Sequence, residues 1–226
     1  TLVFHGVLAQ SFLVLTVLLA YLQSKERRAR LETPEPPATP SVRRWAVAVA
    51  ALIFVQLVVG AAMRHRGAGL ALMDFPTSGG YLVPTFSQAM LDRANEMRMA
   101  YAAQAGIDFM PVTMGQMVIH VAHRLMGVVV AFATLVLAVK ALRTAAADTR
   151  LARGVMLLAG LVVAQFTLGA VAVLSHKEPL LTSIHVVVGA ATLASSTLVV
   201  LRAFPLRLAA EAQAARQAAL KTVSAS

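Results

Sequence analysis

The chain has 226 residues, of which 58% are hydrophobic and only 13% charged, whereas soluble domains carry about 25% charged residues. It contains no cysteine, which excludes disulfides and thiolate metal sites. The net charge of +10 does not indicate nucleic-acid binding, because the basic residues fall in short clusters between apolar runs, the pattern of membrane topology. We therefore expect an all-α, multi-span membrane helix bundle.

Five apolar runs are long enough to span a bilayer, which takes about 20 helical residues. In chain order they cover residues 2–22, 45–63, 117–139, 155–174 and 183–201. The first run does not read as a cleaved signal peptide, since no basic residues precede it. Because the chain begins with Thr1 rather than Met, we expect that its natural N-terminus lies upstream.

The connections between these runs differ in charge. Lysines and arginines concentrate in residues 24–44, 140–153 and 202–221, and the positive-inside rule predicts that these segments are cytoplasmic. The connections 64–116 and 175–182 then face the outer side. In a bacterial cell this pattern predicts a multi-pass protein of the cytoplasmic (inner) membrane, with a cytoplasmic tail.

The first connection, residues 24–44, contains four prolines, at positions 34, 36, 37 and 40. We interpret it as an extended linker between two packing units. Residues 1–23 would form a single helix before the linker, and residues 45–202 a four-helix unit after it, followed by the tail 203–226.

Histidines recur near the outer ends of three apolar runs. His5, His123 and His185 are each followed four residues later by a small residue, respectively Ala9, Gly127 and Gly189. Two facing imidazoles at similar depth can hold one haem iron axially, and small residues let a porphyrin or a partner helix approach the backbone. We predict that the three histidines bind haem iron beside Gly127 and Gly189; the alternative is hydrogen bonding between helices.

Other ionisable residues lie near the same outer mouth. Arg64 and Arg124 suit the propionates of a haem, although snorkelling to lipid headgroups is the alternative for both. The role of Arg66 stays open. His120 shares a helix face with His123 and either lines the haem pocket as a hydrogen-bond donor or bonds to another helix. His65 and His176 are most simply solvated loop residues.

Two further motifs recur in the sequence. A glutamine precedes a glycine by four residues at Gln56 and Gly60, and again at Gln165 and Gly169. Each set either makes a hydrogen bond between helices beside a close contact or contributes to a cofactor site. In the long outer connection, residues 87–107 have the periodicity of a helix, which we expect to lie on the outer surface as a lid.

Several stretches together resemble the haem A synthase family. They are Gln56 to Arg64 with Gly67 to Leu70, then Asp74-Phe75-Pro76, the His-Arg pair within Ile119 to Gly127, and Thr182 to His185. The resemblance implies a pseudo-symmetric eight-helix membrane enzyme that oxidises a ring methyl of haem O to a formyl group, making haem A for terminal oxidases. This chain would hold the last helix of the first half and the whole second half.

The resemblance also implies roles for individual residues. His123 and His185 correspond to the ligands of a haem b, and His5 to one ligand of the substrate haem. The family's catalytic acid belongs to an earlier helix that this sequence lacks, so no catalytic residue is assigned. Some members carry a cysteine pair in outer loops, and this chain has none.

Three function classes stay open from the sequence. The first is haem A synthesis, with haem O synthase or terminal oxidase assembly factors as partners in the membrane. The second is a bis-histidine cytochrome b that only transfers electrons, and the third is a scaffold without haem, whose histidines bond between helices. The sequence leaves open whether copies of the chain form a homo-oligomer.

Overall fold

The computed structural model describes residues 2–32, 38–144 and 149–204. Five of its helices are long and apolar enough to cross a membrane: α1 (Leu2–Gln23), α3 (Pro40–His65), α5 (Met114–Thr144), α6 (Thr149–Leu174) and α7 (Pro179–Ala203). The prediction of a multi-span all-α bundle is confirmed.

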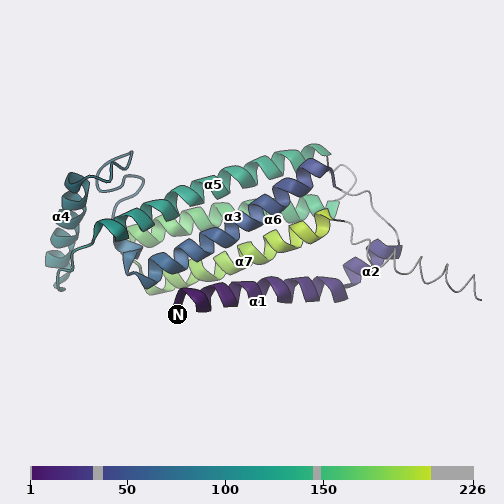
Figure 1. The fold of residues 1–226 in the computed structure, drawn as a ribbon, viewed down its shortest axis with the longest axis horizontal. Helices are drawn as coiled ribbons and strands as arrows, with labels where there is room; N and C mark the ends of the chain where they lie inside the picture. Colours follow the sequence, from purple (N-terminus) through teal and green to yellow (C-terminus); the bar gives the residue numbers. More distant parts are fainter. Residues whose placement is uncertain (1, 33–37, 145–148, 205–226) are drawn as a thin grey trace, which may run out of the picture.

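The spanning helices lie side by side and alternate in direction, with α1 along the side of α7 (Figure 1). The core between α3, α5, α6 and α7 is made of fully buried aliphatic side chains, including Val49, Leu137, Leu158, Leu193 and Val199. We call the end of the bundle that carries α4 the loop end, and the opposite end, which carries α2, the clasp end.

Most helices extend beyond the apolar runs that predicted them. Helix α3 begins at Pro40 rather than at residue 45, because Pro40 occupies the first turn and the Thr39 hydroxyl accepts the Val42 N–H. Helix α5 continues to Thr144, with Arg143 in its last turn, where a cation is favourable. Hydropathy marks the lipid-facing part of a helix, whereas capping decides where the helix ends.

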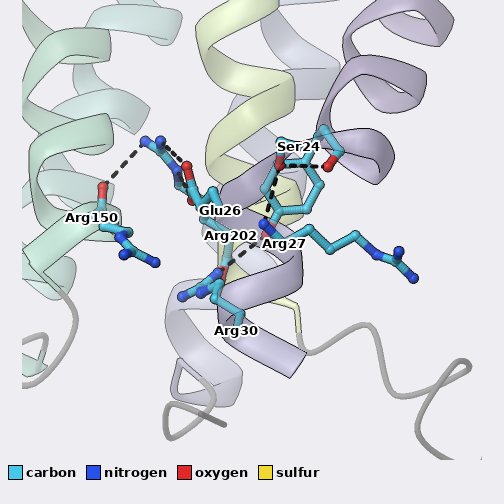
Figure 2. A network of polar contacts seen from close by, with 7 residues as sticks. Ser24, Glu26, Arg27, Arg30, Arg150 and Arg202 are labelled. Carbon is cyan, nitrogen blue, oxygen red and sulfur yellow. Dashed lines mark hydrogen bonds and ion pairs between the residues drawn. The ribbon is translucent and has the colours of Figure 1, made fainter. Parts of the chain in front are cut away.

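The connection after α1 differs from the extended linker that we expected. Residues 25–32 form helix α2 (Lys25–Glu32), while residues 33–37 lie outside the described residues. The Glu26 carboxylate accepts two hydrogen bonds of 2.8 Å from the Arg202 guanidinium on α7, and Arg202 also donates to the Arg150 carbonyl at 3.3 Å (Figure 2). Arg30 donates in turn to the Arg202 carbonyl at 3.0 Å. These contacts of Glu26 and Arg30 with Arg202, which we call the clasp, fasten α2 to the four-helix unit.

The long outer connection contains a short 3-10 helix, η1 (Ala68–Leu70), and helix α4 (Gln88–Ala105). Helix α4 confirms the helix expected over residues 87–107. It is capped by the Ser87 hydroxyl and by Gly106, whose φ of 64° suits glycine. Met90 and Ala94 of α4 pack on Met117 and Val121 at the start of α5, so α4 lies beyond the loop end of the bundle and across its axis (Figure 1).

Candidate functional site

The structure pairs α3 with α5 and α6 with α7, and the two pairs are built alike. In each pair one helix carries a glutamine and a glycine four residues apart, and the other carries a histidine and a glycine four residues apart. The first pair contains Gln56, Gly60, His123 and Gly127; the second contains Gln165, Gly169, His185 and Gly189.

In the α3–α5 pair, the amide of Gln56 lies against His123. Its Nε2 donates to the His123 carbonyl at 3.0 Å and lies 3.3 Å from Nδ1 of the ring. A Cβ atom added at Gly60 would lie 3.0 Å from Cε1 of the imidazole, so the ring occupies the space that glycine leaves. A Cβ at Gly127 would lie 3.6 Å from Nε2 of Gln56.

The α6–α7 pair repeats this arrangement. Nε2 of Gln165 donates to the His185 carbonyl at 2.7 Å. A Cβ at Gly169 would lie 3.4 Å from Cε1 of the His185 ring, and one at Gly189 would lie 3.5 Å from Nε2 of Gln165. Both glutamines therefore make the hydrogen bond between helices that was one of the two roles considered from the sequence.

The two imidazoles differ in their surroundings. His123 and His185 lie near the starts of helices that both begin at the loop end. The ring of His123 has the Gln56 amide beside it. By contrast, Nδ1 of His185 is buried and has no hydrogen-bond partner among the described residues. Buried polar atoms are nearly always satisfied, so this nitrogen lacks the partner that a buried ring nitrogen normally has.

Arg124, the residue after His123, fastens the outer connection to α5. Its two terminal nitrogens donate to four acceptors of one loop: the carbonyls of Leu72, Asp74 and Thr77 and the hydroxyl of Ser78, at 2.8 to 3.3 Å. We call residues 71–81 the Arg124 loop. Phe75 of this loop packs edge-on against Phe166 of α6, with ring centroids 6.0 Å apart, so the loop contacts both helix pairs.

Asp74 stabilises the turn within the Arg124 loop. Its two carboxylate oxygens accept the N–H groups of Gly79 and Gly80, each at 2.8 Å. Burial opposes the ionised form, but these hydrogen bonds and one from Thr77 outweigh it and hold the pKa of Asp74 below its ordinary value. The carboxylate is thus a structural acceptor for the loop.

A family model for cytochrome oxidase assembly proteins, COX15-CtaA, matches residues 1–197. The chain belongs to this family, that of the haem A synthases. The resemblance drawn from the sequence is therefore confirmed at the level of the family. Comparison of the chain with curated proteins and with solved structures found no match.

In this haem A synthase family member, the structure brings four of the predicted site residues into the two helix pairs: His123, His185, Gly127 and Gly189. His120 is buried, and its Nδ1 lies 2.9 Å from the Ala68 carbonyl of η1, so it contacts the outer connection rather than another spanning helix. Arg64 and His5 are both exposed, Arg64 at the end of α3 and His5 at the start of α1.

Other residues of the two outer connections make contacts that the sequence did not reveal. His176, expected to be a solvated loop residue, stacks on Tyr101 of α4 with ring centroids 4.1 Å apart. Asn95 of α4 exchanges two hydrogen bonds with the backbone of Val112, and Arg98 donates to the carbonyls of Leu70 and Met110. Burial lowers the pKa of Arg98. These contacts join segments distant in sequence, so periodicity carries no signal for them.

Proposed function

We propose that the chain acts in haem A synthesis, the oxidation of a ring methyl of haem O to a formyl group, and that its four-helix unit holds a haem b between His123 and His185. The observation that carries the proposal is the repeated pairing of α3 with α5 and α6 with α7, which presents one imidazole from each pair at the loop end. Two histidines in this relation are the axial ligand set of a low-spin haem.

The residues present fit such a group. Within the described ranges the buried Nδ1 of His185 has no hydrogen-bond partner, and glycines rather than larger residues lie against both imidazole rings. The side-chain amides of Gln56 and Gln165 hold the backbone carbonyls of the two histidines, which fixes the helix segments that carry the rings. When bound, a haem b supplies a one-electron redox centre within the membrane.

We further propose that two arginines contact the haem propionates. Arg64 makes no side-chain hydrogen bond within the part of the chain that the structure describes, so its guanidinium is available to a carboxylate. Both terminal nitrogens of Arg124 donate to the loop, and its buried Nε has no hydrogen-bond partner in the described part of the chain. A propionate would therefore have to approach Arg124 at Nε or displace part of the loop.

The remaining assignments follow the same proposal. His5 would contribute to the substrate haem from α1, and His120 would support the pocket through η1. We propose that the loop end faces the outer side of a bacterial inner membrane, since the basic connections lie at the clasp end. Haem O synthase or oxidase assembly factors would then be its partners in that bilayer.

A reduced-minus-oxidised absorbance spectrum of the purified protein, reconstituted with haem b, tests the axial pair. We expect a low-spin haem signal in the parent chain, its loss in His123→Ala and in His185→Ala, and its retention in the matched controls His65→Ala and His176→Ala. Circular dichroism of each variant shows whether its helices remain folded.

The outcomes separate the function classes. A signal that survives in folded His123→Ala and His185→Ala, or a parent that binds no haem, contradicts the axial assignment. Haem O added to membranes that contain the protein together with the upstream helices expected from the sequence should yield haem A on extraction. Haem b binding by that longer protein without any haem A formation would favour a cytochrome that only transfers electrons.

A further inference from the structure

A second candidate site lies at the clasp end, at the opposite end of the bundle from the histidines. An open cavity of about 520 Å³ is lined there by Pro40, Arg43, Arg44, Val47, Ala48 and Phe204. A second cavity of about 280 Å³ lies between α1, α3 and α7, and Val47 lines it as well. Both cavities lie along α3 and Val47 lines each of them, so we consider them together as the α3 groove.

The mouth of the α3 groove is positively charged and has no acidic partner among the residues that the structure describes. The guanidinium of Arg43 lies over the Phe204 ring, 5.6 Å from its centroid, and its buried Nε has no hydrogen-bond partner among the described residues. Arg44 is exposed beside it. The ion pairs seen in the described ranges involve neither side chain. Two guanidiniums with free donors suit a phosphate group.

The rest of the α3 groove is apolar. Its deeper part is lined by Val14 of α1, by Ala51 and Phe54 of α3, and by Thr197 and Val200 of α7. From Arg43 to Phe54 the groove follows α3 for about 16 Å, at about 1.5 Å of rise per residue. That length suits a hydrocarbon chain rather than a water-soluble ligand.

The level of the mouth matches the boundary between lipid headgroups and hydrocarbon. Trp45, half-buried, follows the two arginines, and tryptophan is enriched at that boundary. Val47 and Ala48, one turn deeper, are exposed on the bundle surface that faces lipid. The charged mouth therefore suits the headgroup of a lipid molecule, and the apolar groove suits its acyl chain.

We propose that the α3 groove binds an anionic phospholipid of the leaflet at the clasp end. Its phosphate lies between the guanidiniums of Arg43 and Arg44, and one acyl chain follows the apolar wall past Val47 to Phe54. The lipid fills the space between α1 and the four-helix unit, and it stabilises the attachment of α1.

Native mass spectrometry of the detergent-purified protein tests this site, with phosphatidylglycerol and phosphatidylcholine added in parallel. We expect the parent chain to retain phosphatidylglycerol preferentially. The double variant Arg43→Gln/Arg44→Gln should retain at least five-fold less. The matched control Arg28→Gln/Arg143→Gln removes the same charge from exposed positions at the same end and should retain as much as the parent. Ala51→Phe, which fills the groove without changing charge, should also lose the lipid.

The other outcomes overturn the proposal. Equal retention of the two lipids, or an equal loss in the Arg28→Gln/Arg143→Gln control, would show that binding depends on general charge and not on this groove. A thermal-shift measurement with inorganic phosphate distinguishes a free anion from a lipid. If phosphate stabilises the parent as much as phosphatidylglycerol does, and Ala51→Phe has no effect, the site is an anion site without an acyl groove.

Discussion

The α3–α5 and α6–α7 pairs share one arrangement of glutamine, histidine and glycine, yet their imidazoles are held differently. The ring of His123 lies beside the Gln56 amide and fits tightly against Gly60, whereas the buried Nδ1 of His185 has no partner among the described residues and its ring fits less tightly against Gly169. The repeated motif thus holds the backbone of both histidines in the same way, but only the His123 ring has an amide beside its nitrogens in the described ranges. The repeat sets where the imidazoles lie, and the neighbouring side chains set what each one can bind.

The largest difference between the pairs is the residue that follows each histidine. Arg124 after His123 holds the outer loop, whereas Val186 after His185 has no such role. Replacing Arg124 with Met, which makes α5 resemble α7, leaves several loop carbonyls without their charged donor and should destabilise the loop locally by about 3 kcal/mol. Amide exchange in residues 71–81 should then accelerate on the order of 100-fold. The exposed control Arg66→Met should leave exchange unchanged. Exchange in Arg124→Met as slow as in the parent would show that Arg124 does not stabilise this loop.

Alanine substitution at Gly60 and at Gly169 should have the next largest effect, and the effect should differ between the two helix pairs. Gly60→Ala pushes a methyl group to 3.0 Å from the His123 ring and should cost about 1–3 kcal/mol, with a shifted haem spectrum in the reconstituted protein. The methyl group added by Gly169→Ala would lie 3.4 Å from the His185 ring, which is an ordinary contact. Alanine's higher helix propensity should stabilise the helix by about 0.5–1 kcal/mol and so offset any cost of this contact. Equal effects in thermal unfolding would show that the pairs are packed equally.

The two glutamines offer a finer comparison. Gln56→Leu and Gln165→Leu each remove one hydrogen bond between helices and should each cost about 0.6 kcal/mol in thermal unfolding. Only Gln56 also lies beside an imidazole ring, so only Gln56→Leu should change the spectrum of a haem bound at His123. A spectral change in Gln165→Leu of similar size would mean that backbone position, rather than ring contact, tunes the ligand.

The smallest expected effect is the pH dependence of the Arg124 loop. Because the pKa of Asp74 is lowered in the folded loop, its hydrogen bonds stabilise the loop above the ordinary aspartate pKa of 3.8, and that stabilisation is lost as the pH falls through the lowered value. Proteolysis of residues 71–81 by an acid-active protease should therefore increase as the pH falls below about 4. Asp74→Asn should remove this dependence; a loop that opens at the same pH in both proteins would exclude Asp74 as its cause.

The sequence could predict the features that depend on periodicity and hydropathy. The five spanning helices and the helix in the outer connection follow from apolar runs and spacing, and the shared motifs of Gln56 and Gln165 were visible as a repeat. The helix over residues 25–32 was missed because neighbouring prolines indicated an extended chain, whereas Glu26 is held by a residue near the other end of the sequence.

Contacts made by loops could not be predicted from the sequence for a similar reason. Arg124 was predicted to meet a propionate, and that stays a prediction. Its contacts with loop carbonyls were not foreseen, because they come from a loop that also packs Phe75 against Phe166 of α6. His176 and Tyr101 likewise meet only through folding.

The clasp between Glu26 and Arg202 joins two distant parts of the chain without a covalent bond. Arg202 lies near the end of α7, and Glu26 follows α1, so the first helix is held by the last one as well as by the polypeptide that leads to α3. Near the loop end α1 also passes close to α3, because a Cβ added at Gly6 would lie 3.4 Å from the Cβ of Ala61. We therefore expect α1 with α2, expressed as one polypeptide, to associate in the bilayer with the four-helix unit expressed as another, which co-purification of the two would show.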